Sequence, residues 1–259
     1  MTSLTASWMN CGISSDGGWA SHLGEPKVKL TFASYNIHKG VGVDGRRDAD
    51  RIITVLREVN ADIIALQEAD RRFGQRASVL PRAMLDDTPW RAVPVAKRPR
   101  SLGWHGNALL VRRDIECVEA HALDLPMLEP RGAVMAELVS EGRRLRIFGV
   151  HLDLSGLRRR DQINALLGQC NGGEPCPTVI MGDFNQWGRL TGAMQAFGVA
   201  WQLIAPGASY PSQRPVALLD RIVASRHWDF CDAGVHHSAM AAQASDHLPI
   251  WAELLLPKK

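Results

Sequence analysis

The eight residues from Thr178 to Asn185 constrain the fold of this chain more than any other stretch. The run Thr178–Met181 is apolar or β-branched throughout, which is typical of a strand buried on both faces. Gly182 ends the run, and Asp183 and Asn185 follow on either side of a phenylalanine. The pattern predicts a buried strand that delivers a carboxylate and a carboxamide to a cleft, where they bind a metal-bound phosphate or hold a water. These residues alone leave open a plain turn, in which both side chains bond their own backbone.

The same pattern, an apolar strand followed by a polar residue, recurs three times. The predicted strands span residues 28–35, 62–67 and 144–150, and the residues that follow them are Asn36, Glu68 and His151. Ordinary alternatives exist for each: Asn36 as a turn cap, His151 as a structural histidine, and Glu68 as a surface acid or a partner of Arg71 or Arg72. Four polar groups at the exits of four buried strands nevertheless indicate one shared cleft.

Helical spacing of apolar residues predicts helices over residues 50–59 and 158–167, with Arg159 and Gln162 on a shared face of the second. Strands that alternate with helices suggest, by themselves, a parallel doubly wound α/β sheet. Further strands are expected over residues 106–111, 131–138 and 218–223 and at the end of the chain. No repeat or linker interrupts residues 27–257, so we expect one domain behind a flexible tail at residues 1–26.

Composition excludes a disordered chain and leaves the substrate open. The 259 residues are 46% hydrophobic and 22% charged, as in globular proteins that bury a sizeable core. A net charge of +3 permits a phosphate-bearing substrate without requiring nucleic acid. Five cysteines without paired spacing, a tail without signal-peptide features and the lack of a long apolar run lead us to expect a cytoplasmic protein with reduced thiols and no transmembrane segment.

One loop, one arginine and one buried acid are further candidates for the site. The Pro-rich segment 71–106 contains a basic stretch with Arg98 and Arg100, which either faces the substrate or is solvated surface. Arg131, at the entrance of a strand, either clamps a phosphate or pairs with an acid. Asp220 lies within a predicted strand, where an unpaired carboxylate is costly to bury, so we expect it to have a partner.

In chain order, these motifs resemble those of the endonuclease/exonuclease/phosphatase superfamily, which has the deoxyribonuclease I-like fold. The resemblance rests on Asn36, Leu66–Glu68, Gly106–Asn107, Arg131–Ala133, His151–Asp153, Gly182–Asn185, Leu219–Ile222 and Ser245–His247. The first motif, Asn-Ile-His-Lys-Gly, is similar to that of a compact bacterial branch. The resemblance implies an α/β (α+β) fold, a four-layered sandwich of two packed, mostly antiparallel β-sheets flanked by helices.

It also implies roles for particular residues. Glu68 would be the chief Mg²⁺ ligand with Asn36 and Asp246 beside it, and Mn²⁺ would substitute. His247 would be the general base and Asp220 its orienting carboxylate. His151 would donate to a phosphate oxygen, Asp183 and Asn185 would position water or the leaving oxygen, and Asn107 and Arg131 would bind substrate phosphate. A leaving-group acid has no clear counterpart beside Gly106–Asn107, where His105 stands.

The expected activity is therefore Mg²⁺-dependent hydrolysis of phosphoesters, either nuclease-like cleavage of diesters or phosphatase action on monoesters. A phospholipid or inositol-phosphate substrate is one alternative, and an inactive phosphate-binding protein is another. Glu68, Asp220, Asp246 and His247 are all present, which favours catalysis. We expect a monomer that acts on nucleic acid, a lipid head group or a small molecule.

Overall fold

The computed structural model describes residues 28–72, 74–126, 131–171, 175–188 and 192–256, and the predicted tail lies outside them. The strands of the described chain form two six-stranded sheets. The first has the strand order β11 (Asp229–Val235), β12 (Ile250–Leu256), β1 (Val28–Asn36), β2 (Ile63–Gln67), β4 (Ala108–Arg112) and β3 (Trp90–Ala92). The second has the order β5 (Glu116–Leu123), β6 (Ala133–Ser140), β7 (Arg143–His151), β8 (Thr178–Asp183), β10 (Asp220–Ser225) and β9 (Trp201–Ile204).

Both sheets are mixed, with one parallel pair near the centre of each. Strands β1 and β2 are parallel, as are β7 and β8, and the other paired strands are antiparallel. The doubly wound sheet suggested by periodicity is therefore wrong, and the sandwich implied by the resemblance is confirmed. The error has a physical cause: the helix-containing crossovers β1-α1-β2 and β7-α3-β8 do join parallel strands, but direct antiparallel connections such as β5-β6-β7 build much of the rest.

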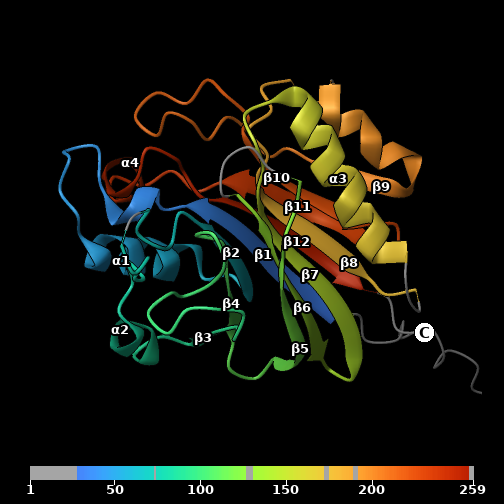
Figure 1. Ribbon diagram of the computed structural model, residues 1–259, viewed down its shortest axis with the longest axis horizontal. Coiled ribbons are helices and arrows are strands. Elements are labelled where there is room, and N and C mark those ends of the chain that lie inside the picture. Colours follow the sequence, from blue (N-terminus) through green and yellow to red (C-terminus); the bar gives the residue numbers. More distant parts are fainter. Residues whose placement is uncertain (1–27, 73, 127–130, 172–174, 189–191, 257–259) are drawn as a thin grey trace, which may run out of the picture.

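Helices cover the outer faces of the two sheets (Figure 1). The first sheet packs against α1 (Ala49–Val59), α2 (Arg82–Asp86) and α4 (Ala241–Ala244). The second packs against α3 (Gly156–Asn171) and the 3-10 segment η2 (Gly192–Ala200). A short 3-10 turn, η1 (His38–Gly40), follows β1. No helix of the described ranges is long and apolar enough to cross a membrane.

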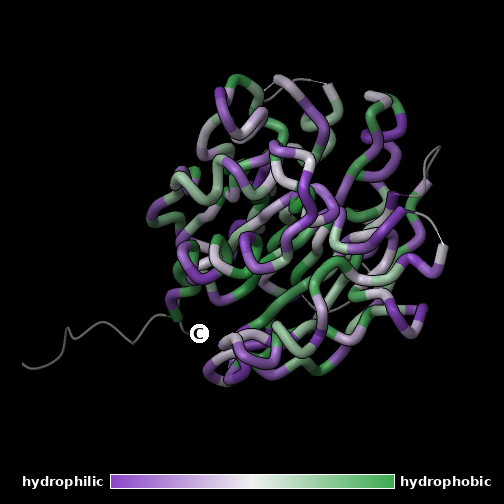
Figure 2. The backbone as a smooth tube through the Cα atoms, turned by 90° about the vertical axis from the view of Figure 1, so that its left-hand side faces the viewer, coloured by the Kyte–Doolittle hydropathy of each residue, from purple (hydrophilic) through white to green (hydrophobic). Residues whose placement is uncertain are grey.

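Three hydrophobic clusters hold the layers together. The cluster between the sheets includes Phe32, Ile63, Ile147 and Met181, which come from both sheets. The other two clusters lie between a sheet and its helices, so each central strand is buried on both faces. In Figure 2 the hydrophobic parts of the chain run through the interior, and hydrophilic parts prevail in the outer loops. This burial explains why the central strands read as continuous apolar runs.

Helix α1 shows how local sequence sets the boundaries of an element. The Asp48 side chain accepts hydrogen bonds from the backbone N–H groups of Asp50 and Arg51 and caps the first turn. Asn60 ends the helix in the left-handed conformation, with φ of 51°. Between these caps the buried face carries Ile52, Val55 and Leu56, at helical spacing. The chain thus turns back at Asn60 and enters β2 beside β1.

The topology brings the ends of some strands and the beginnings of others to one edge of the sandwich. Parallel strands end at the same edge, so β1 and β2 end together, as do β7 and β8. Their antiparallel neighbours begin there: Asp220, the first residue of β10, lies opposite Asp183 at the end of β8. Strand β12 begins at Ile250 opposite Ser34 near the end of β1. Residues just before β12 therefore meet those that follow β1 and β8.

Candidate active site

His247 and Asp220 form a buried pair that joins the two sheets. His247 Nδ1 lies 2.8 Å from Asp220 Oδ2, which also accepts a hydrogen bond from the Ser209 hydroxyl. The other ring nitrogen, Nε2, lies 3.9 Å from Asp183 Oδ2. The ring of Tyr210 packs on the imidazole with 4.8 Å between ring centroids. These contacts fix the orientation of the imidazole, and the carboxylate holds a proton on Nδ1.

The surroundings of His247 give it a high proton affinity. Burial alone lowers the pKa of the imidazole, but Asp220, Asp183 and Asp246 outweigh burial and raise this pKa to about 10. In the metal-free chain the ring is therefore protonated at neutral pH. When it is neutral, it is a strong acceptor for a proton, as a general base must be.

Asn36 and Asp183 meet across the sandwich, one from each sheet. Asn36 Nδ2 donates to Asp183 Oδ2 at 3.2 Å. Both side chains also bond local backbone, because the N–H of His38 donates to Asn36 Oδ1 and the N–H of Asn185 donates to Asp183 Oδ1. The amide of Asn185 donates to the carbonyl of Leu152 at 2.9 Å. The local turns predicted as an alternative are therefore present, and the same turns bring Asn36 and Asp183 into contact with each other.

Glu68 forms an ion pair with Lys39, and not with Arg71 or Arg72. Glu68 adopts the left-handed backbone conformation, with φ of 56°, at the exit of β2. Burial raises the pKa of Glu68, but nearby positive charge, including the ammonium of Lys39, outweighs burial and holds this pKa below its usual range. The carboxylate is therefore ionised and already lies against a cation. Its backbone conformation is uncommon for a residue with a side chain and marks a constrained position.

Asp246 is partly exposed and lies beside the turn that follows β1. Its Oδ1 lies 3.8 Å from His38 Nδ1, and the hydroxyl of Ser245 donates to the same oxygen at 3.4 Å. The Ser245 hydroxyl also donates to the carbonyl of Asn36 at 2.7 Å. His38 also interacts with Glu68, so it lies between the two acids. The structure thus gathers Asn36, Glu68 and Asp246 around the turn that follows β1.

His151 is neutral in this structure and accepts a hydrogen bond. The guanidinium of Arg131 donates to His151 Nε2 and to the carbonyl of Leu152. Burial lowers the pKa of His151, and the negative charge of Asp183 opposes this effect. Repulsion from Arg131 adds to burial, so the pKa falls to about 4. With Nε2 occupied as an acceptor, the group that offers N–H donors here is Arg131. A role for His151 as donor to phosphate therefore requires that Arg131 move off Nε2.

Asn107 is not brought into the cleft. Its side chain is fully buried, and Nδ2 donates to the carbonyls of Gly132 at 2.9 Å and Trp104 at 3.4 Å. Among the described residues, the amide oxygen of Asn107 has no hydrogen-bond partner. In this arrangement Asn107 connects the loop before β4 to the chain beside Arg131. Its predicted role at a substrate phosphate stays a prediction.

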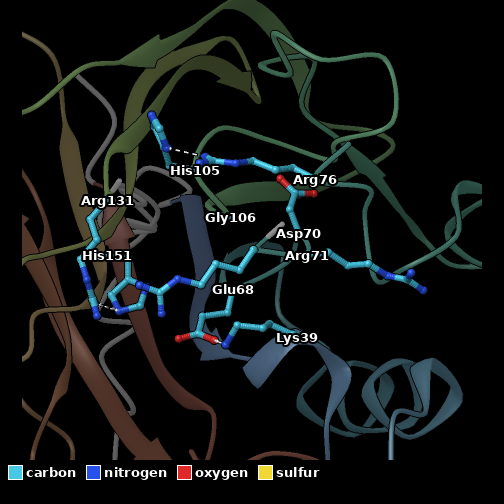
Figure 3. A pocket seen from close by; sticks show the side chains of 10 residues that line it. Lys39, Glu68, Asp70, Arg71, Arg76, His105, Gly106, Arg131 and His151 are labelled. Carbon is cyan, nitrogen blue, oxygen red and sulfur yellow. Dashed lines mark hydrogen bonds and ion pairs between the residues drawn. The ribbon is translucent and has the colours of Figure 1, made fainter. Parts of the chain in front are cut away.

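A basic cavity lies beside this network (Figure 3). It is lined by Lys39, Glu68, Asp70, Arg71, Arg72, Arg76, His105, Gly106, Arg131 and His151. Arg98 and Arg100, the sequence candidates for substrate contact, do not line it. Sequence reasoning treated Arg71 and Arg72 only as partners for Glu68 and overlooked Lys39 and Arg76. The available signal was the cluster of three arginines within six residues after the Glu68 strand end.

Two buried arginines hold the loops that carry the site. Arg159, on α3, donates to the carbonyls of Asp153 and Leu154 and to the side chain of Gln186. Arg221 donates to the carbonyls of Gln186 and Gly188 at 2.7 and 2.6 Å. The loops after β7 and β8 are therefore tied to each other. Helical spacing had placed Arg159 and Gln162 on one face, and the Gln162 side chain indeed accepts from the N–H of Asp153 at 2.9 Å.

Two groups of side chains are candidates for holding a cation. Ligand atoms of Asp183, Asp220 and His247 lie within 4.8 Å of one another. That group is buried and already bonded internally, since His247 bonds Asp220 and Asp183 accepts from Asn36. Mg²⁺ prefers oxygen ligands and keeps several waters, which suits Glu68 and the partly exposed Asp246 better. The ammonium of Lys39 already lies against Glu68 as a counter-charge.

Comparison with known proteins supports the fold. A sequence model of the Endonuclease/Exonuclease/phosphatase family matches residues 33–247. YbhP of Escherichia coli (strain K12) is 29% identical over 252 residues, covering 85% of this chain and 94% of YbhP. The solved structure of D. rerio TDP2 with a single strand DNA product has a TM-score of 0.67 at 15% identity, covering 87% of this chain and 98% of that one. The mannosyl-6-phosphatase Bt3783 of Bacteroides thetaiotaomicron also has a TM-score of 0.67, at 19% identity, covering 87% and 99%.

Proposed function

The chain belongs to the endonuclease/exonuclease/phosphatase family, and from this premise we propose that it is a Mg²⁺-dependent phosphoesterase. In this proposal, His247 and Asp220 activate the attacking water. The observation that carries the proposal is the buried contact of 2.8 Å between His247 Nδ1 and Asp220 Oδ2. This contact leaves Nε2 as the nitrogen that takes a proton from water.

The donor set fits a hard divalent cation. Glu68 would hold it, with Asp246 and the amide oxygen of Asn36 beside it, and Lys39 would then leave the carboxylate. Only oxygen atoms are offered, and Asp246 is open enough for waters to complete the shell. When bound, Mg²⁺ neutralises charge on the phosphoryl oxygens and helps to orient the phosphate. Mn²⁺ has the same preference for oxygen and would substitute.

Proton removal falls to His247. The negative charges of Asp220, Asp183 and Asp246 favour the imidazolium that forms when His247 accepts a proton from water. Asp220 keeps the other ring proton on Nδ1 and so fixes the tautomer. Tyr210 and the Ser209 hydroxyl hold this pair in place. Asp183, 3.9 Å from Nε2, is placed to accept a hydrogen bond from the same water.

Cationic hydrogen-bond donors would stabilise the negative charge on the phosphoryl group. Arg131 carries N–H groups beside His151, and Lys39 becomes available once it leaves Glu68. Such preorganised donors stabilise the charge that builds up during hydrolysis.

The proposed substrate is either a phosphodiester or a phosphomonoester. TDP2 has been solved with a single strand DNA product, and Bt3783 is a mannosyl-6-phosphatase, so similar folds serve nucleic acid and sugar monoesters. A lipid head group or an inositol phosphate fits the same chemistry. The presence of Glu68, Asp220, Asp246 and His247 supports catalysis over the inactive alternative.

A substrate panel tests the proposal. Single-stranded and duplex DNA, RNA, a chromogenic phosphodiester, phosphomonoesters and phospholipids would be assayed with Mg²⁺ and with a chelator. We expect hydrolysis of at least one class in Mg²⁺ and none in chelator. Full turnover in metal-free buffer would remove the metal mechanism, and no turnover of any substrate would favour the binding-only alternative.

A further inference from the structure

The basic cavity extends beyond the groups that the proposed mechanism uses. Figure 3 shows Glu68, His151 and Lys39 at one end and Arg76 with His105 at the other. Gly106 lines the cavity between them, with φ of +82°. A Cβ atom at this position would lie 3.4 Å from the Cα of Glu68. The glycine thus lets the chain pass close to Glu68 and keeps a side chain out of the space between the two ends.

The acidic residues of the cavity are already engaged. Glu68 is paired with Lys39. Asp70 is buried, and its two oxygens accept hydrogen bonds from the hydroxyl of Ser101 and from the N–H of Leu102. The lining holds five basic side chains against these two acids. Positive charge therefore prevails at the end of the cavity away from Lys39.

Arg76 is held there by a neutral partner. Its Nη1 lies 3.0 Å from His105 Nδ1, so His105 accepts on Nδ1 and carries its proton on Nε2. Burial and the charge of Arg76 lower the pKa of His105, which keeps the ring neutral. The edge-to-face contact with Trp104, 4.3 Å between centroids, fixes the ring. No carboxylate of the described residues forms an ion pair with Arg76, and Asp70 acts on it only at longer range.

We propose that Arg76 and His105 form a subsite for a second phosphate group of the substrate, next to the phosphoester that is cleaved. The inference rests on the proposed function and adds the substrate class: molecules with two neighbouring phosphates. A guanidinium offers paired N–H donors that match phosphate oxygens, and His105 Nε2–H supplies another donor beside them. The second phosphate is either the next one along a nucleic-acid strand or a second ester on a small molecule.

A matched pair of substrates tests the subsite. The p-nitrophenyl ester of thymidine 5′-phosphate would be compared with the same ester that also carries a 3′-phosphate. We expect kcat/KM of the wild type to favour the bisphosphate by about tenfold or more. Arg76→Ala should reduce this preference by about tenfold to a hundredfold, mainly through KM of the bisphosphate, because a charge-assisted contact is lost. Arg76→Lys, which keeps the charge, should retain part of the preference.

Control variants separate the subsite from general charge effects. Arg160 is an exposed arginine on α3 outside the cavity, and Arg160→Ala should keep the wild-type preference. A wild type without preference, or an Arg76→Ala variant that keeps it, would overturn the proposal. If only Arg98→Ala and Arg100→Ala lost the preference for the bisphosphate, the proposal would also be overturned. The second phosphate would then bind the basic stretch that contains these two arginines. A substrate that carries a further nucleotide on the 3′-phosphate distinguishes a strand from a small bisphosphate.

A binding experiment separates failure of the subsite from failure of the proposed function. Titration of inorganic pyrophosphate into the metal-free protein, followed by calorimetry, needs no catalysis. We expect binding to wild type and at least tenfold weaker binding to Arg76→Ala, with circular dichroism to show that the variant is folded. If no ester is hydrolysed but this difference is seen, the subsite stands and the proposed function fails. Equal pyrophosphate binding by both proteins would overturn the subsite even if hydrolysis were found.

Discussion

At the scale of single residues, the site drives the pKa values of two histidines in opposite directions. Burial acts on both, but three carboxylates raise the pKa of His247 to about 10, whereas Arg131 adds to burial at His151, where the pKa falls to about 4. Groups whose pKa values are pushed apart in one site mark different acid–base roles. His247 is the strong proton acceptor, and His151 is a neutral ring that positions Arg131.

The carboxylate of Asp220 should set the pH dependence of the reaction. The neutral form of His247 is the active base, so the rate should rise as pH rises through its pKa. Asp220→Asn removes a negative neighbour that raises this pKa, and the acidic limb of the rate profile should move to lower pH. Initial rates measured across pH for both proteins check this shift. An acidic limb that stays in place would assign it to another group.

His247 and Asp220 should also behave as one unit. His247→Ala should lose about a hundredfold to ten-thousandfold in kcat, the usual range for a general base. Asp220→Asn should lose much of the same activity, and the double variant should be little worse than the worse single variant. Arg221, the next residue along β10, donates to the backbone carbonyls of Leu218, Gln186 and Gly188. Strictly additive losses in kcat would show that Asp220 has a separate, structural role.

At the scale of secondary-structure elements, the sequence predicts what is buried and overlooks what lies at an edge. The central strands β1, β2, β7 and β8 were predicted within a few residues, because burial on both faces makes them continuous apolar runs. Strands β5 and β11 were overlooked, because they are edge strands with mostly exposed or half-buried side chains. Their pairing depends on partners distant in sequence, which local periodicity does not contain.

The same distinction applies to the site. Strand ends pointed to Asn36, Glu68, His151 and Asp183, since a buried strand must deliver its last residue somewhere. Arg76 and His105 lie in irregular loops, where no period reports which way a side chain faces. Their placement depends on contacts such as Gly106 beside Glu68, which only the folded chain shows.

Loop anchoring by α3 should affect both stability and catalysis. Arg159 is buried and donates to two carbonyls after β7 and to Gln186 after β8. Arg159→Ala should lower the free energy of unfolding by about 1–3 kcal/mol, because buried acceptors lose their donors. It should also lower kcat, since the loops carry Asn185 and the chain after His151. Urea unfolding and steady-state kinetics measure both effects, and the neighbouring exposed Arg160→Ala is the control. Equal effects of the two substitutions would contradict the anchoring role.

At the scale of the whole molecule, the active site is assembled across the sandwich. Asn36 ends β1 of the first sheet and His247 lies in the loop just before β12 of the same sheet, whereas Asp183 and Asp220 belong to the second sheet. The hydrogen bonds Asn36 to Asp183 and His247 to Asp220 are therefore contacts between sheets. Catalytic geometry thus depends on how the two sheets pack, although their shared core lies away from the chemistry.

A core substitution tests this dependence. Phe32 is fully buried between the sheets, with its ring centroid 5.2 Å from that of Trp228. Phe32→Ala should lower the free energy of unfolding by about 3–5 kcal/mol through lost burial and a new cavity. The exposed Phe230→Ala on β11 should change it by less than about 0.5 kcal/mol. Urea denaturation followed by tryptophan fluorescence measures both, and equal changes would contradict the two-sheet core.

The central claim is that Glu68 holds the metal while His247 takes the proton. The most direct test is one measurement, Mn²⁺ affinity by calorimetry, on the wild type, Glu68→Gln and His247→Ala. We expect at least tenfold weaker binding for Glu68→Gln and nearly wild-type binding for His247→Ala, because in this proposal the imidazole is not a ligand. Wild-type affinity in Glu68→Gln together with weak binding in His247→Ala would place the metal among Asp183, Asp220 and His247 and contradict the account.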